Sequence, residues 1–150
     1  MSLFRNLRCG IQVQIIWFDQ HMVQYQFSCS NGRFSSHADI YLGHDDLANR
    51  AEALRGFPAR ADDSRDFELG TFDPQHADGG IRMHFYCRDS RGHAAVDVQL
   101  RGDACKALGE IESVALPIPI EPAGVDSFVA QVKQMDANEI GAFDCLDMAG

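Results

Sequence analysis

Long apolar runs are missing from this 150-residue sequence. No window approaches the ~18 apolar residues that a membrane helix needs. The stretch MSLFRNLRCGIQVQIIWF has an apolar segment interrupted by Gln12 and Gln14 and has no small-residue cleavage site, so it does not predict a signal peptide. Zinc-site spacing is missing as well, because the five cysteines (Cys9, Cys29, Cys87, Cys105 and Cys145) are odd in number, far apart and form no C-x-x-C pair. We expect a protein of the reducing cytoplasm that does not contact a membrane.

Known catalytic and nucleotide-binding motifs are also absent. The sequence contains no G-x-S-x-G, H-E-x-x-H, P-loop or dinucleotide fingerprint. Basic charge is scarce, since 13 Lys and Arg oppose 22 Asp and Glu for a net charge of −9. Such a field repels phosphate backbones and speeds encounter with basic proteins. We therefore expect no nucleic-acid partner, and the sequence assigns no catalytic residue, metal ligand or cofactor.

Period-two alternation dominates the first third of the chain. Residues 11–17, 22–29 and 33–42 each place apolar side chains on one phase, which predicts three half-buried strands in a meander. On this pattern Trp17 belongs to the core phase, and Asn31 with Gly32 predicts a type I′ turn. Further strands are expected at 67–72 and in a hairpin over 81–101, and Pro117 and Pro119 predict that the strand at 113–121 lies at a sheet edge.

Two segments change to helical spacing. Leu47, Ala51 and Leu54 predict a short helix that ends near Gly56 and Pro58, and residues 124–135 predict a second amphipathic helix. Between the first helix and the next strand, a mobile acidic loop is expected to carry Asp62, Asp63, Asp66 and Glu68. The resulting prediction is one α+β domain over 1–150, with a mainly antiparallel sheet of about six or seven strands and two helices packed against it. Residues 136–150 either form a loosely ordered tail or dock through Phe143 and Leu146.

The hairpin carries the candidate site. Its predicted register sets Arg82 opposite Gln99 and His84 opposite Asp97, with the pairs Phe85–Val96 and Met83–Val98 on the other face. The outward residues proposed for binding are Arg82, His84, Tyr86, Arg88, His93 and Asp97. Opposite charges on a solvated strand explain this pattern most simply, since such pairs contribute ~0.2–1 kcal/mol each. A partner-binding face is the second interpretation, and acid–base chemistry by His84 with Asp97 is the third.

His37, Asp39 and His44 offer a weaker alternative. His-x-Asp on a strand supplies two possible metal ligands, yet a metal site needs more ligands from elsewhere in the chain. A solvated strand face is the preferred interpretation of these residues.

The segments LRGFP, FELGTFD, GGIRMHFYCRDSRGHAAVDVQL and IPIEPAGVDSFVAQV together resemble a group of small bacterial single-domain proteins of unknown function. The resemblance covers about residues 45–135, and Asp89, Gly92 and His93 match the Asp-x-x-Gly-His of the group's hairpin. The layout is similar to that of proteins suspected of being immunity partners of polymorphic toxins. The resemblance implies a protein-binding role and carries over no catalytic residues, and a turn role alone explains Asp89 and Gly92.

The leading hypothesis is a non-enzymatic cytoplasmic binding protein whose acidic surface engages another protein, such as a basic toxin or effector. A small hydrolase that uses His84, Asp97 and His93 is one alternative. A structural domain that forms homo-oligomers through the edge strand at 113–121 is another.

Overall fold

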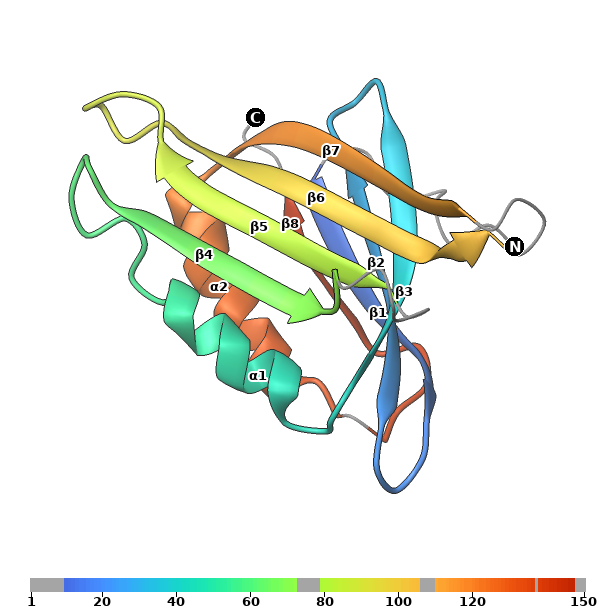
Figure 1. Cartoon of the computed structure of the whole chain (residues 1–150). Coiled ribbons are helices and arrows are strands. Elements are labelled where there is room, and N and C mark those ends of the chain that lie inside the picture. Colours follow the sequence, from blue (N-terminus) through green and yellow to red (C-terminus); the bar gives the residue numbers. More distant parts are fainter. Residues whose placement is uncertain (1–9, 73–78, 106–109, 137, 148–150) are drawn as a thin grey trace.

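The computed structural model describes residues 10–72, 79–105, 110–136 and 138–147 (Figure 1). It contains α+β structure with antiparallel pairing throughout. The strands are β1 (Gly10–Phe18), β2 (Val23–Ser30), β3 (Ser35–Leu42), β4 (Ser64–Gly70), β5 (Gly80–Cys87), β6 (Ala94–Cys105), β7 (Glu110–Ile120) and β8 (Phe143–Asp147). The helices are α1 (Asp46–Ala51), followed by one 3₁₀ turn (Glu52–Leu54), and α2 (Pro122–Gln134).

Two sheets replace the single sheet that the sequence predicts. The first has the order β3-β2-β1-β8 and the second β4-β5-β6-β7, with four strands in each. The prediction of one sheet with six or seven strands is therefore wrong in this detail. The difference arises at the end of β3, because α1 follows there and the next strand, β4, pairs with β5 and not with β3. The strands of the two sheets run in clearly different directions (Figure 1).

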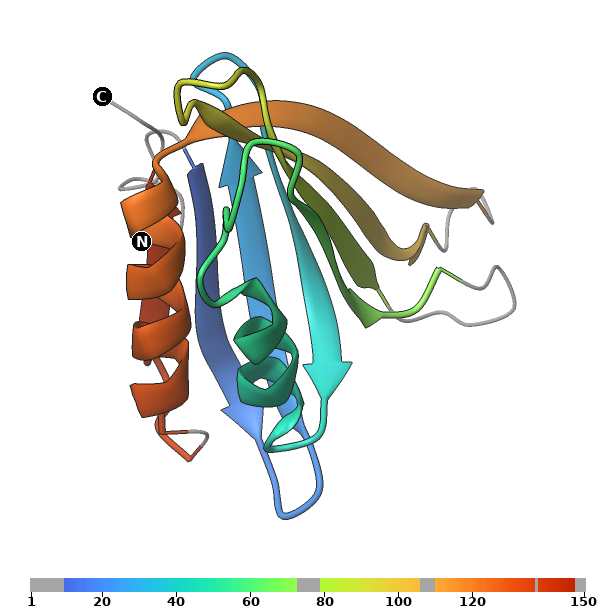
Figure 2. The same ribbon diagram turned by 90° about the vertical axis from the view of Figure 1, so that its left-hand side faces the viewer.

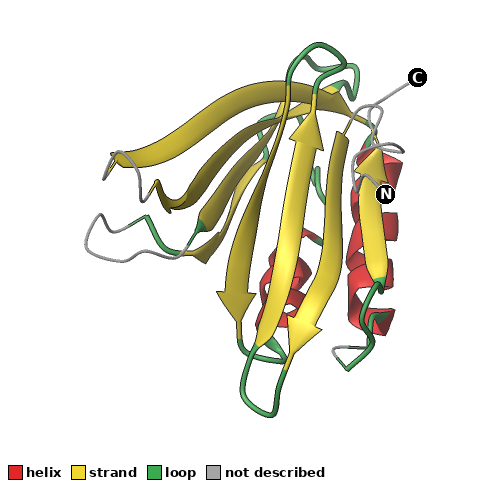
Figure 3. Cartoon of the chain, turned by 90° about the vertical axis from the view of Figure 1, so that its right-hand side faces the viewer, coloured by secondary structure: helices red, strands yellow, loops and turns green. Residues whose placement is uncertain are grey.

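The apolar faces of the sheets and the helices share one core. Its fully buried side chains include Phe27 of the first sheet, Phe85 of the second and Phe128 of α2. Both helices lie behind the first sheet when that sheet faces the viewer (Figure 3), and α1 and α2 pack side by side (Figure 2). The outer face of each sheet is therefore left without a helix in the described part of the chain.

A bulge in β1 reverses the predicted position of Trp17. The register with β2 shifts between Ile15 and Trp17, so Trp17 pairs with Gln24 on the outer face and Phe18 pairs with Val23 on the inner one. Trp17 is 43% exposed. The prediction of a core tryptophan is therefore wrong, because a bulge inserts one residue and inverts the alternation beyond it.

The turn after β2 also differs from its prediction. Of the two central residues, only Gly32 has a positive φ (91°), whereas a type I′ turn requires positive φ at both. The side-chain carboxamide of Asn31 instead accepts hydrogen bonds from the amides of Arg33 and Phe34, at 3.0 and 2.9 Å. Asn31 therefore closes the turn through its side chain.

The acidic segment after α1 is ordered, which corrects the prediction of a mobile loop. Asp66 and Glu68 belong to β4, while Asp63 is buried. The Asp63 carboxylate pairs with Arg65 at 2.9 Å and accepts the Ala59 amide at 2.7 Å. Arg65, followed by that amide, lowers the pKa of Asp63 below its ordinary value. Asp62 alone of the four stands on the exposed loop, paired with Arg60.

The C-terminal third of the chain supplies one edge strand to each sheet, β7 to the second and β8 to the first. β7 lies at the edge of the second sheet, which confirms the prediction made from Pro117 and Pro119. Helix α2 begins at Pro122, and the Asp126 carboxylate accepts the amide of Gly56, which joins α2 to the end of the 3₁₀ turn. Of the two alternatives for residues 136–150, docking through Leu146 is what the described residues show, since β8 pairs with β1 and Leu146 is 1% exposed. Residues 137 and 148–150 lie outside the described part of the chain.

One close contact joins the two sheets. A Cβ atom added to Gly79 would lie 2.5 Å from the carbonyl oxygen of Asp39 in β3 and 2.9 Å from that of Arg101 in β6. The backbone of β3 therefore passes directly over the start of β5, and only glycine fits there.

Candidate functional site

The outer face of β4–β7 carries the predicted binding residues. The observed β5–β6 register matches the predicted one at every pair, with Arg82 opposite Gln99, His84 opposite Asp97 and Tyr86 opposite Ala95. Phe85, Met83, Val96 and Val98 are buried on the inner face. Arg82, His84 and Asp97 are exposed on the outer face, which adjoins no helix in the described residues.

Asp66 and Glu68 of β4 engage the two basic side chains of β5. The Nε atom of Arg82 lies 3.1 Å from Oε2 of Glu68, and its guanidinium stacks 4.0 Å from the centroid of the Phe72 ring. Nδ1 of His84 lies 2.8 Å from Oδ1 of Asp66. The carboxylate that orients the imidazole therefore comes from β4, although the register sets His84 opposite Asp97.

Asp97 is consequently left with a weak partner. Among the described residues, the one hydrogen bond recorded for its carboxylate comes from the Tyr86 hydroxyl at 3.5 Å, the outer limit for such a bond. Burial, followed by the charge of Asp97, raises the pKa of Tyr86 above its ordinary value. The Tyr86 ring stacks on that of His84, with centroids 5.7 Å apart and an interplanar angle of 21°. Asp97 thus stands beside two stacked rings, and no cation of the described residues is paired with it.

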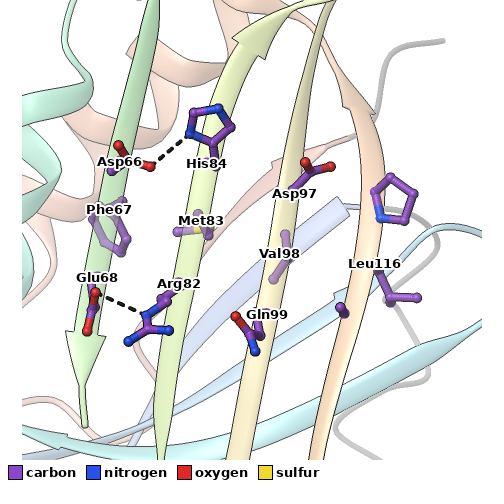
Figure 4. A pocket seen from close by; sticks show the side chains of 12 residues that line it. Asp66, Phe67, Glu68, Arg82, Met83, His84, Asp97, Val98, Gln99 and Leu116 are labelled. Atoms are coloured by element: carbon purple, nitrogen blue, oxygen red, sulfur yellow. Dashed lines mark hydrogen bonds and ion pairs between the residues drawn. The ribbon is translucent and has the colours of Figure 1, made fainter. Parts of the chain in front are cut away.

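A depression of about 490 Å³ lies over the middle of this face (Figure 4). Its ionisable side chains are those of Asp66, Glu68, Arg82, His84 and Asp97. On the β7 side the outward positions are Ala115 and Pro117, which lie opposite Gln99 and Asp97. The hollow follows from this difference in side-chain length, because long side chains on β4 and β5 stand beside short ones on β7.

Arg88 and His93 lie at the end of the hairpin, and neither they nor Tyr86 line the depression. The Arg88 amide donates to the His93 carbonyl at 2.7 Å, and the Asp89 carboxylate accepts the Arg91 amide at 2.8 Å and contacts Nδ1 of His93 at 2.6 Å. The bond to His93, followed by that from Arg91, lowers the pKa of Asp89. Gly92 has a φ of 90°, so Asp89 and Gly92 have the predicted turn role.

The histidines do not converge on one carboxylate. His93 precedes Asp97 by four residues along an extended segment, a separation of about 13 Å at the usual strand rise. His84 is bonded to Asp66 and His93 to Asp89. Among the residues that the structure describes, no group of three or more His, Cys, Asp and Glu side chains is placed to hold a metal ion. Asp39 accepts hydrogen bonds from Gln24 and Gln26, and a ring nitrogen of His44 lies 2.7 Å from the Asp19 carbonyl.

Five outward-facing residues of the depression are not among the predicted binding residues: Asp66, Glu68, Gln99, Ala115 and Pro117. A signal for the first two was present, since Ser64, Asp66 and Glu68 alternate with Arg65, Phe67 and Leu69 in strand period. The contribution of β7 had no such signal, because alanine and proline do not themselves indicate a site.

The fold and this face define an α+β protein with an uncovered, charged sheet surface. The chain matches no family model, no curated protein and no solved structure. No helix in the described part of the chain is long and apolar enough to cross a membrane.

Proposed function

We propose that the protein is a non-enzymatic, cytoplasmic binding module of the immunity-like kind, which engages a basic protein through the outer face of β4–β7. The observation that carries this proposal is the depression on a sheet face that no helix of the described residues covers. A hollow with an apolar side and a charged rim is suited to receive a side chain of a partner.

Charge gives the class of partner. The chain has a net charge of −9, and the depression itself has three carboxylates against one guanidinium. An acidic surface of this kind accelerates association with a cationic protein and weakens as salt is added. The cytoplasmic location is supported by Cys29 and Cys87, which are free thiols in the described part of the chain, as expected for a reducing compartment.

Catalysis is less well supported by the same geometry. A hydrolase that used His84, Asp97 and His93 would need these groups within hydrogen-bond reach of one another or of one substrate. The two histidines are instead engaged by different aspartates, one on β4 and one in the hairpin turn.

Affinity capture tests the proposal. The immobilised chain is exposed to lysate of the native organism at low and at about 300 mM salt, where the Debye length is near 6 Å. The test variant is Asp66→Asn/Asp97→Asn. The matched control is Asp45→Asn/Glu121→Gln, which makes the same change in net charge at exposed residues outside the depression.

The proposal is supported if one protein with an excess of Lys and Arg is captured by wild type and by the control variant. The test variant should not capture this protein, and the higher salt concentration should release it. Capture of an acidic protein, equal capture by all variants, or no capture at all would overturn the proposal.

A further inference from the structure

Arg82 and His84 are already engaged within the depression, and this determines which group it can accept. The Arg82 guanidinium is held between Glu68 and the Phe72 ring, and the His84 imidazole between Asp66 and the Tyr86 ring. An incoming anion would have to displace a carboxylate from one of them. The depression therefore does not offer a free cation to an acidic ligand.

Asp97 offers the opposite charge. Its carboxylate is exposed and has only the long contact with the Tyr86 hydroxyl in the described part of the molecule. The three carboxylates of the lining outnumber its one guanidinium. An incoming cation would find a carboxylate without having to break an ion pair.

The surroundings of Asp97 indicate which cation fits. Pro117 lies directly opposite it on β7, and Ala115 lies opposite Gln99 two residues away. These short apolar side chains provide a surface for an aliphatic stem. On the other side stands the His84–Tyr86 stack, and planar guanidinium groups stack on such rings and pair with carboxylates through two parallel hydrogen bonds.

We infer that the depression on β4–β7 receives an arginine side chain of the basic partner, with its guanidinium on Asp97 and its stem over Ala115 and Pro117. This inference rests on the proposed function and deepens it, because it assigns the partner's anchoring residue. Arginine is a frequent anchor of protein interfaces, so a hollow of this shape is a suitable site for it.

The test is an NMR titration of the ¹⁵N-labelled full chain with N-acetyl-arginine amide, in which the backbone amide resonances are monitored. The neutral isostere N-acetyl-citrulline amide and N-acetyl-lysine amide are the comparison probes. We expect arginine to shift the amides of Asp97, Gln99, Ala115 and Leu116, and citrulline to leave them unchanged. The Asp97→Asn variant should bind arginine about fivefold more weakly, the ratio expected for loss of a solvent-accessible ion pair. Asp45→Asn should stay within twofold of wild type.

Equal binding of citrulline, equal binding by Asp97→Asn, or shifts confined to other parts of the chain would overturn the arginine site. Lysine binding as tight as that of arginine would overturn the choice of a planar guanidinium. If arginine fails in these ways while the Asp66→Asn/Asp97→Asn variant still loses a basic partner, this inference fails and the proposed function stands. If arginine binds as described and no basic partner is captured, the proposed function fails and the site stands.

Discussion

At the scale of single residues, substitutions at neighbouring positions of β5 should have very different effects on stability, because the side chains lie on opposite faces of the strand. Phe85 is fully buried and meets the Phe57 ring edge to face, with centroids 5.9 Å apart. Phe85→Ala should lower the free energy of unfolding by about 3–5 kcal/mol, because it removes a core aromatic and leaves a cavity. His84→Ala should cost under about 1 kcal/mol, because His84 is exposed. Urea denaturation of both variants measures the contrast, and similar losses would contradict the assignment of faces.

Asp63 predicts how stability depends on pH. Arg65, followed by the Ala59 amide, lowers the pKa of Asp63 in the folded state. A depressed folded-state pKa means that the carboxylate stabilises the fold above its unfolded pKa near 4, and that this contribution is lost as the pH falls through the folded-state value. Asp63→Asn should therefore reduce stability at pH 7 by about 1–3 kcal/mol, the usual cost of losing a hydrogen bond to a charged group.

The same variant should also flatten the fall in stability below pH 4. Thermal unfolding between pH 2 and pH 7 measures this, with Asp62→Asn on the exposed loop as the control. An acid limb as steep as that of wild type would show that Asp63 is not responsible.

Residue-scale prediction from the sequence worked where polar and apolar residues alternate strictly. His84, Phe85, Tyr86 and their partners on β6 were placed on the correct faces because one slip would mix the two faces. Trp17 was misplaced because Ile15, Ile16, Trp17 and Phe18 are all apolar. In a continuous apolar run polar and apolar residues do not alternate. The sequence therefore does not show which residues face the core, and it does not show the bulge.

At the scale of elements, β8 should contribute to the core through alternate positions. Leu146 lies opposite Ile11 and is buried, whereas Cys145 lies opposite Gln12 on the outer face. Leu146→Ala should lower the free energy of unfolding by about 2–5 kcal/mol, while Cys145→Ala should change it by less than about 1 kcal/mol. Chemical denaturation decides, and a reversed order of the two variants would show that β8 is out of register.

β7 presents a different element-scale prediction. Pro117 and Pro119 lie on an edge strand and have no N–H to offer to another strand, which opposes edge-to-edge pairing. Pro117→Thr/Pro119→Thr should restore two donors and increase self-association. Sedimentation velocity at several concentrations measures this. Ala115→Thr is the control, because it adds a threonine side chain without adding a backbone N–H donor. An unchanged sedimentation profile would contradict a protective role for the prolines.

The elements themselves were mostly predictable, and their partners were not. Local patterns place the strands β1 to β7, the edge position of β7 and both helices close to where they occur, whereas no pattern predicted a strand at β8. The pairing of β8 with β1 joins the two ends of the sequence, and no local pattern records which distant strands meet. The depression was unpredictable for the same reason, since β4 and β7 had to be placed on either side of the hairpin.

At the scale of the whole molecule, the two sheets repeat one topology. β4-β5-β6-β7 is a four-stranded meander followed by α2. In β8-β1-β2-β3 four antiparallel strands follow one another in the same way before α1, but β8 is joined to β1 by pairing and not by the chain. Each helix leads into the first strand of the opposite sheet. The C-terminal end of β8 lies beside the N-terminal end of β1, with Asp147 paired to Gly10.

This arrangement predicts that the chain can be circularly permuted. A permutant that begins at Asn138, joins Gly150 to Met1 and ends at Ala137 keeps every strand pair and opens only the connection between α2 and β8. We expect it to fold with native secondary structure and a melting temperature within a few degrees of wild type. A permutant opened inside β6 is the control that should fail. Circular dichroism and thermal melting measure both, and a permutant opened before β8 that stays unfolded would contradict the prediction.

Because Asp147 pairs with Gly10, the two units of four strands and one helix follow each other in a closed cycle. The position of the chain termini in this cycle depends only on which connection is open. A protein with the same neighbouring strands could begin at β4 and end at α1. Its sequence would align with this one only in two exchanged blocks, although the two structures would superpose throughout. Similarity among proteins with this arrangement therefore depends on which strands pair with each other. The order of those strands in the sequence can differ.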